Sequence, residues 1–262
     1  FAKGETKEIC YCHTPPRYLY GYETSRDWQK HWYIRPYALI VNHFMRLYDF
    51  RQAQKVTWFI ANSAEVQARI KKFYRRESIV ICPPVGTSEV KSADTSEVKG
   101  YFLTGGRLEK SKNFDLIIKA CNRLKVPLKI YGIGTQLGYL RSLAGPTVEF
   151  LGIVNDGQRQ RLMAECRAFI VAATDEDFGI TPVEAMGAGR PVIAFRGGGY
   201  LETVVGGKTG EFFDSPTVES LAEVMRKFRP ERYKSADCLA QAQKFSQERF
   251  IAEIKKFVKN KL

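Results

Sequence analysis

The sequence lacks several features that would assign it to a class at once. It has no apolar run near the roughly 18 to 20 residues of a membrane-spanning helix. Its six cysteines lack the spacing of a disulfide framework, so we interpret them as reduced thiols of the core. Cys10, Cys12 and His13 have no second ligand pair at zinc spacing, and strand alternation places His13 opposite both thiols. No metal site is expected.

A dinucleotide-binding fingerprint is also missing. Gly132 and Gly134 follow an apolar run at 128–131, but the third glycine, Gly138, comes one position late. No acidic residue lies about 20 residues further on to bind a ribose, and Glu149 comes too early. The sequence therefore argues against a nicotinamide-dependent oxidoreductase.

The chain is long enough for two globular domains. It has 262 residues, 44% hydrophobic and 26% charged, which is typical of a globular protein with a sizeable core. Its net charge of +13 indicates an anionic partner: nucleic acid, phospholipid headgroups or nucleotide phosphates. A nucleic-acid-binding protein would cluster basic residues with exposed aromatics, whereas the motifs here follow strands. We therefore expect no nucleic-acid partner.

One stretch, residues 174–195, organises the chain. The apolar run at 168–173 predicts a buried parallel strand that ends on an acidic loop. Thr181 as N-cap, Pro182 as the first helical residue and Glu184 as the partner in a capping box then predict a helix. A second strand follows at 192–195. This order places the acidic loop at the carboxyl edge of a sheet, where open α/β sheets bind ligands.

The acidic loop has the chemistry of a phosphate and sugar site. Seven residues separate Glu176 from Glu184, with Phe178 and Gly179 between them. A helix N-terminus suits a phosphate, the glycine permits close approach, and carboxylates suit sugar hydroxyls. From these residues alone a second interpretation stays open, in which Glu184 only caps its helix and Glu176 is solvated.

Two other predicted strands end on candidate site residues. The strand at 101–104 runs into Gly105 and Gly106, and Arg107 and Lys112 lie around this turn, where both could reach one diphosphate. A solvated basic loop is the alternative. His13 follows a strand at 8–12, and its alternative role is to satisfy the backbone of its proline-rich loop.

The remaining elements complete an alternating strand and helix pattern. Helices are predicted at 28–54, 64–75, 114–124, 215–228 and 234–259, and the polar stretch 87–99 as a linker between domains 1–86 and 100–262. An apolar stripe on the first helix is predicted to be core (Tyr37, Ile40, Val41, Phe44, Leu47). The basic residues around the second are predicted to form a solvated face or, alternatively, a phospholipid-facing patch (Arg69, Lys71, Lys72, Arg75, Arg76).

These motifs together resemble one enzyme family. Two glutamates seven residues apart around Phe-Gly, followed by EAMGAGRPVIA, resemble the signature of retaining GT-B glycosyltransferases of family 4. The segments G-R-L-x-x-x-K-N and YCHTPPRYLY are similar to segments of this family, the latter to WbaZ-type mannosyltransferases. The resemblance implies two Rossmann-like α/β domains with parallel sheets. It also implies that the first is incomplete, with roughly 90 to 100 further residues expected before His13.

The resemblance also implies the activity and the site. The expected reaction moves a hexose, mannose or glucose, from a GDP- or UDP-sugar to a glycan or lipid-linked acceptor, with no metal or other cofactor. A sugar-nucleotide-binding module with little or no transfer is the alternative. Residues at the reacting sugar would be His13 and Glu176; those at the diphosphate would be Gly106, Arg107, Lys112, Gly179, Ile180 and Thr181; those at the rest of the donor would be Phe178, Glu184 and Val154. We expect a cytoplasmic protein, with an anionic membrane surface as a further candidate partner.

Overall fold

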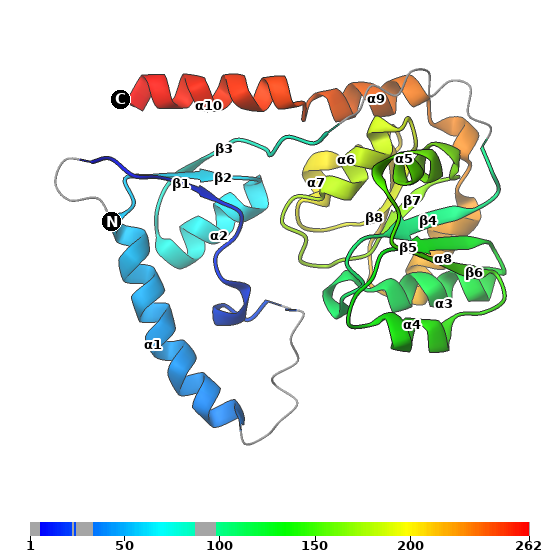
Figure 1. Cartoon of the computed structure of the whole chain (residues 1–262), viewed down its shortest axis with the longest axis horizontal. Helices are drawn as coiled ribbons and strands as arrows, with labels where there is room; N and C mark the ends of the chain where they lie inside the picture. Colours follow the sequence, from blue (N-terminus) through cyan, green and yellow to red (C-terminus); the bar gives the residue numbers. More distant parts are fainter. Residues whose placement is uncertain (1–5, 23, 25–33, 87–97, 262) are drawn as a thin grey trace. The chain divides into compact units, whose positions relative to one another are not determined.

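The chain forms two compact units, each built on a parallel sheet (Figure 1). The computed structural model describes residues 6–22, 24, 34–86 and 98–261. The first unit is Phe1–Cys82 and the second is Pro83–Leu262. Val85 lies with the second unit, since its side chain is buried and its N–H donates to the Phe245 carbonyl at 2.9 Å. The division therefore lies just before the predicted one, and most of the predicted linker falls outside the described residues.

The first unit is a three-stranded sheet in the order β1-β2-β3. These strands are Ile9–Cys12, Trp58–Ala61 and Ser78–Val80, and α2 (Ala64–Tyr74) connects the last two. The Ser63 hydroxyl accepts a hydrogen bond from the Val66 N–H at 3.0 Å and so caps the start of α2. The core gathers apolar side chains from β1, β2 and α2 (Cys12, Phe59, Ala61, Val66, Ile70, Tyr74).

The long helix of this unit does not bury its apolar stripe. Helix α1 spans Ile34–Lys55, and residues 28–33 of the predicted helix lie outside the described part of the chain. Tyr37 is 70% exposed and Phe44 64% exposed, so the prediction that the stripe is core is wrong; its other members are exposed as well (Ile40, Val41, Leu47). The reason is that α1 packs on α2 and on the 3-10 turn η1 (Arg17–Leu19) through its later turns, where Ala53 is buried.

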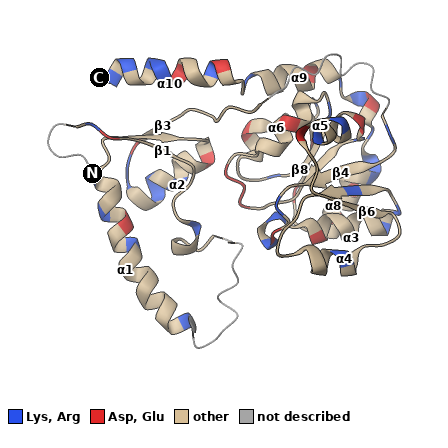
Figure 2. Cartoon of the chain, viewed as in Figure 1, with Lys and Arg blue, Asp and Glu red and all other residues tan. Residues whose placement is uncertain are grey.

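Two of the basic residues around α2 are structural, which corrects the expected solvated basic face. Arg69 is 2% exposed, pairs with Glu65 at 3.0 Å, donates to the Thr14 hydroxyl at 3.1 Å and stacks on the Tyr22 ring. Lys and Arg residues also lie along α1, α10 and several loops (Figure 2). The exposed basic residues of the helix reduce to Lys71, Lys72 and Arg75, and contact with an anionic membrane stays a prediction.

Arg76 closes the end of α1. Its guanidinium donates to four main-chain carbonyls, those of Ala53 and Gln54 in the last turn and of Val56 and Thr57 beyond it, at 2.7 to 3.2 Å. The last carbonyls of a helix have no partner within the helix, and its C-terminus carries partial negative charge. Arg76 donates to these carbonyls and places its positive charge at this helix end. It thereby joins α1 to β2.

Replacing Arg76 by alanine should therefore destabilise the first unit. We expect a loss of about 2 to 3 kcal/mol in its free energy of unfolding, because several charge-assisted hydrogen bonds disappear together. All three tryptophans lie in this unit (Trp28, Trp32, Trp58), so urea unfolding followed by their fluorescence reports on it. Lys71→Ala is the control, since it removes only an exposed ion pair with Glu77. Equal midpoints for both variants would contradict the structural role of Arg76.

The second unit is a doubly wound, six-stranded parallel sheet in the order β6-β5-β4-β7-β8-β9. Its strands in chain order are Phe102–Gly105 (β4), Leu128–Tyr131 (β5), Val148–Gly152 (β6), Phe169–Val171 (β7), Val192–Phe195 (β8) and Gly210–Phe213 (β9). The chain begins in the middle at β4, winds outward to β6 and then returns to β7. The predicted α/β class with parallel sheets is confirmed, and the winding reverses between β4 and β7.

Helices cover both faces of this sheet (Figure 1). On one face lie α3 (Phe114–Leu124), α4 (Leu137–Leu143) and α8 (Val218–Lys227). On the other lie α5 (Asp156–Glu165), α6 (Ile180–Gly187) and α9 (Ser235–Gln243), and the short α7 (Tyr200–Thr203) contacts α6. The apolar strands are buried on both sides, as Leu103, Phe169 and Ile170 show.

The predicted helix at 234–259 is wrong in one respect, because it is two helices. After α9 the chain bends at residues 244–246 and α10 runs over Gln247–Lys261. Phe245 fixes the bend, since its ring is buried edge-on against Phe178 at 5.3 Å. The Ser246 hydroxyl accepts from the Arg249 N–H at 3.3 Å at the start of α10. Among the described residues, no helix is both long and apolar enough to cross a membrane.

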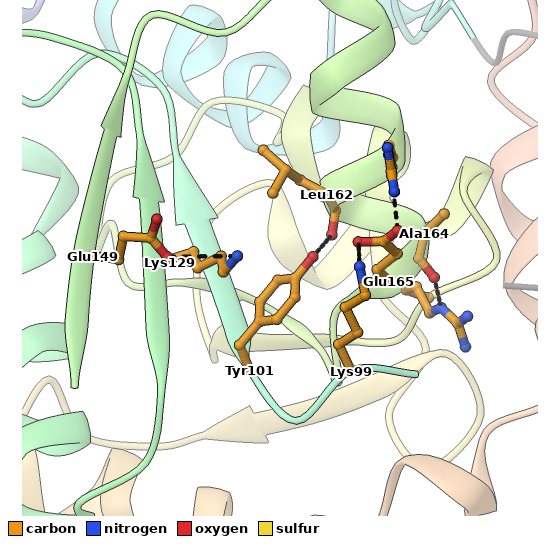
Figure 3. A network of polar contacts seen from close by, with 9 residues as sticks. Lys99, Tyr101, Lys129, Glu149, Leu162, Ala164 and Glu165 are labelled. Atoms are coloured by element: carbon orange, nitrogen blue, oxygen red, sulfur yellow. Dashed lines mark hydrogen bonds and ion pairs between the residues drawn. The ribbon is translucent and has the colours of Figure 1, made fainter. Parts of the chain in front are cut away.

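Polar contacts hold the start of β4 against the end of α5 (Figure 3). Lys99 pairs with Glu165 at 2.7 Å, and the Tyr101 hydroxyl donates to the Leu162 carbonyl at 2.9 Å. Hydrogen bonds from Lys99 lower the pKa of the Glu165 carboxyl. These contacts hold β4 at its N-terminal end. Its C-terminal end leads into a loop.

Candidate active site

An ion pair joins two loops across the point where the winding of the second sheet reverses. Lys112 ends the 3-10 turn η4 (Lys110–Lys112) that follows β4, and Glu176 lies in the loop that follows β7. Their Nζ and Oε2 atoms are 2.6 Å apart, and the Glu176 side chain is 16% exposed. Asn113 joins the same loops by donating its side-chain N–H to the Ala172 carbonyl at 2.9 Å. Both proposed ligand residues therefore meet at one edge of the sheet.

The glycine-rich loop after β8 supports Glu176 from the other side. The Tyr200 hydroxyl donates to its Oε2 at 3.2 Å, and the Gly199 N–H donates to its carbonyl at 2.9 Å. A Cβ atom at Gly198 would lie 2.4 Å from that carbonyl oxygen, so only glycine permits this approach. Glu176 is thus held by three loops and is not simply solvated.

The loop after β4 has its own glycine support. A Cβ atom at Gly132 would lie 1.9 Å from the Gly106 carbonyl oxygen, and one at Gly134 would lie 2.3 Å from that of Leu108. Gly132 and Gly134, the two glycines of the incomplete dinucleotide fingerprint, are therefore needed for close packing of the main chain. The Gly106 N–H is already used, since it donates to the Tyr131 carbonyl at 3.1 Å. Arg107, the next residue, is exposed at the same edge.

Helix α6 begins earlier than predicted, and the predicted capping box is wrong. The N-cap is Gly179, at a φ of 90°, and no side chain caps the helix. Glu184 lies in the second turn and cannot reach the cap. The N–H groups of Ile180 and Thr181 are left without a side-chain acceptor, which is the arrangement that binds anions. Phe178 buries its ring against Phe245, so it can offer a ligand only its main chain.

Glu184, on α6, belongs to a second charged cluster, whose other members are Arg159 and Asp156 on α5. Its carboxylate lies 3.3 Å from the Nη2 atom of Arg159, and the same Nη2 lies 3.1 Å from Asp156. The Glu184 side chain is 18% exposed. Burial raises the pKa of Glu184, Arg159 opposes this, and Asp156 adds to it. Val154 is half-buried just before α5, next to this cluster in the chain.

The sequence interpretation missed three side chains of the site. Tyr200 and Asn113 support the loops, and Arg159 pairs with Glu184. Arg159 could have been noticed, because Asn155 and Gln158 form a capping box that fixes the start of α5. Asn113 ends the G-R-L-x-x-x-K-N segment, but the contacts of Asn113 and Tyr200 are with residues more than twenty positions away, which no local pattern predicts.

The predicted site residue His13 lies apart from this cluster. His13 belongs to the first unit, where it is exposed at the carboxyl end of β1 with its ring edge-on to Tyr11 at 5.3 Å. Across the described parts of the chain, no three His, Cys, Asp or Glu side chains are grouped to hold a metal ion. Within the second unit the structure pairs Lys112 with Glu176 and, separately, Glu184 with Arg159, while Gly106 and Phe178 are limited in what they can offer.

Comparison with known proteins identifies the family of this chain. Residues 87–245, more than half of the chain, match the family described as glycosyl transferases group 1. The chain belongs to the group 1 glycosyltransferases. Its predicted family is therefore confirmed.

Individual relatives share parts of this chain. An alpha-1,3/1,6-mannosyltransferase of Dictyostelium discoideum is 49% identical over 80 residues, 30% of this chain and 19% of its own length. The GtfA subunit of a UDP-N-acetylglucosamine–peptide N-acetylglucosaminyltransferase of Streptococcus parasanguinis is 26% identical over 241 residues, 82% of this chain and 47% of its own length. The chain thus spans about half, or less, of these relatives.

Solved structures confirm the type of fold. The structure of Anabaena Alr3699/HepE in complex with UDP gives a TM-score of 0.71 at 21% identity, over 84% of this chain and 68% of that one. Pneumococcal GtfA, solved with UDP and GlcNAc, gives 0.66 at 22% identity, over 81% and 47%. These likenesses confirm the predicted GT-B type of α/β fold.

The raised pKa of Glu184 predicts how stability depends on pH. A carboxyl with a raised pKa in the folded state favours folding while it is protonated, and this stabilisation is lost as pH rises from its ordinary value of 4.5 through the folded value. Glu184→Gln cannot ionise. The stability of this variant relative to the native chain should therefore rise from pH 4 to pH 7.

Urea unfolding followed by circular dichroism at each pH would measure this difference, and tryptophan fluorescence would separate out the first unit. Glu223→Gln is the control: the hydrogen bond from Lys227 lowers the pKa of that exposed carboxyl, so the relative stability of this variant should not rise over the same pH range. A difference that falls with rising pH would mean that pairing with Arg159 outweighs burial.

Proposed function

We propose that this chain carries the donor site of a retaining, metal-independent hexosyltransferase. The observation that carries the proposal is the Lys112–Glu176 pair, which sets a cation and a carboxylate side by side at the sheet edge. The open N-terminus of α6 begins four residues after Glu176 in the same loop. A nucleotide diphosphate sugar needs all three: donors for its phosphates, a cation for its charge and a carboxylate for its sugar hydroxyls.

The leaving group sets the chemical task of this site. As the bond to the sugar breaks, negative charge grows on the departing diphosphate, and preorganised donors stabilise it. Arg107, Lys112 and the N–H groups of Ile180 and Thr181 would serve this purpose, with the Gly179 main chain close to the phosphates. Glu176 holds Lys112 in place before the ligand arrives, so little ordering is needed on binding.

The other residues would bind the remainder of the donor. Glu176 would accept a hydrogen bond from a sugar hydroxyl, Glu184 from the ribose, and Val154 would contact the base. His13 would lie beside the anomeric carbon. We assign the sugar as mannose or glucose, the nucleotide as GDP or UDP, and the acceptor as a glycan or lipid-linked hydroxyl. The relative named as a mannosyltransferase supports mannose, and the neighbour solved with UDP supports a uridine nucleotide.

A donor-binding module with little transfer is the second candidate. It is favoured by one observation, that every diphosphate and ribose residue proposed here lies in the second unit. Donor binding and sugar transfer must therefore be measured separately.

Removing either cation should weaken donor binding. Arg107→Ala and Lys112→Ala should each cost about 1.5 to 3 kcal/mol, the range for hydrogen bonds to charged groups. Calorimetry with GDP and UDP measures this loss. Lys119→Ala, on the exposed side of α3, is the control and should bind like the native chain. Native affinity in both site variants would remove the diphosphate assignment.

Transfer itself should not need a divalent metal. Incubating the chain with a panel of nucleotide sugars and glycan acceptors, with and without excess EDTA, should give the same product by mass spectrometry in both conditions. Binding without product from any donor would favour the module. Product that EDTA abolishes and Mg²⁺ or Mn²⁺ restores would refute the metal-independent assignment.

A further inference from the structure

One buried hydroxyl next to this site has no partner. Tyr131 ends β5 and is 6% exposed, and its hydroxyl is buried without a hydrogen bond to any described residue. Its ring lies against the main chain of β4, where a Cβ atom at Gly105 would be 2.4 Å from the ring. Buried side-chain hydroxyls nearly always have a partner, so an exception needs an explanation. The chain keeps a glycine at 105 that makes room for this ring.

The charged groups that act on this hydroxyl are those of the proposed ribose cluster. Burial raises the pKa of Tyr131, the Glu184 carboxylate raises it further, and Arg159 opposes both. Tyr131 lies at the carboxyl end of β5, next to β4, on whose loop Arg107 and Lys112 stand. The hydroxyl therefore stays protonated and lies within electrostatic reach of α5 and α6.

The cluster can release Glu184 to a ligand. Arg159 contacts Glu184 and Asp156 through the same Nη2 atom, so it keeps one carboxylate partner if the other turns away. Glu184 can then accept from a ribose hydroxyl without leaving the half-buried Arg159 unpaired. A ribose carries neighbouring hydroxyls that both donate and accept, so one that binds Glu184 has another to offer a second protein group.

We propose that Tyr131 is a further donor-binding residue, whose hydroxyl hydrogen-bonds the ribose that Glu184 holds. This inference rests on the proposed function of the site. It explains why a polar atom is left without a partner beside an otherwise well-bonded cluster: the partner arrives with the nucleotide. Tyr131 would then distinguish ribonucleotides from their deoxy analogues.

Tyr131→Phe separates this role from a structural one. The substitution removes only the oxygen, so the ligand-free chain should unfold at the same temperature or slightly higher, since no hydrogen bond is lost. Affinity for GDP or UDP should fall about 3- to 10-fold, which corresponds to one neutral hydrogen bond. With the 2′-deoxy or the 3′-deoxy nucleoside diphosphate, whichever lacks the hydroxyl that Tyr131 binds, the variant and the native chain should bind equally.

Tyr101→Phe is the matched control. The Tyr101 side chain is buried in the same unit, but its hydroxyl donates to the Leu162 carbonyl (Figure 3). This variant should lower the unfolding temperature and leave nucleotide affinity unchanged. Calorimetry with GDP, UDP and their deoxy analogues, together with thermal unfolding of all three proteins, gives every value required.

Each outcome decides the inference. Equal affinity of Tyr131→Phe and the native chain for ribonucleotides overturns it, as does an equal loss with both deoxy analogues. A fall in unfolding temperature like that of Tyr101→Phe would show that the hydroxyl has a partner in the free protein. If the native chain binds no nucleoside diphosphate at all, the proposed function itself fails, and that result is distinct from the others.

Discussion

The 2.6 Å pair between Lys112 and Glu176 depends on the order of strands in the second unit. These residues are 64 positions apart, and they meet because β4 and β7 are neighbours although two strands and three helices separate them along the chain. In a doubly wound sheet the loops on either side of the reversal point turn away to opposite faces. Open α/β sheets bind ligands at this point, and here the Lys112–Glu176 pair joins the two loops.

Glycine makes this edge possible at several places, for a steric reason. The loops after β4, β5, β7 and β8 approach so closely that side chains at Gly132 or Gly198 would overlap main-chain oxygens. Main chain packed on main chain holds the loops rigidly, and Tyr200 can then place its hydroxyl against Glu176. A site built this way is ordered before its ligand binds, which lowers the entropic cost of binding.

Charge in this protein has two uses that composition cannot separate. The net charge of +13 indicated an anionic partner. Arg69 and Arg76, however, make internal contacts of the first unit. Arg159 similarly pairs with Glu184 and Asp156. Guanidinium groups suit such positions because they offer five N–H donors in a fixed plane and stay charged when buried. Net charge therefore does not show which basic residues are available to an anionic partner.

The sequence by itself determined the elements whose signals are local. Period and branching located α3, β5 and β8 at their observed bounds, and α2 to within one residue. Tertiary structure decided the rest. The same local pattern at Thr181 fits a capped helix, but the loop from β7 enters at Gly179, so the helix starts earlier. Whether the α1 stripe is buried, where the last helix bends and which carboxylate meets Lys112 all depend on residues far away in the chain. A window of a few residues records its own preferences, and it cannot record what will pack against it.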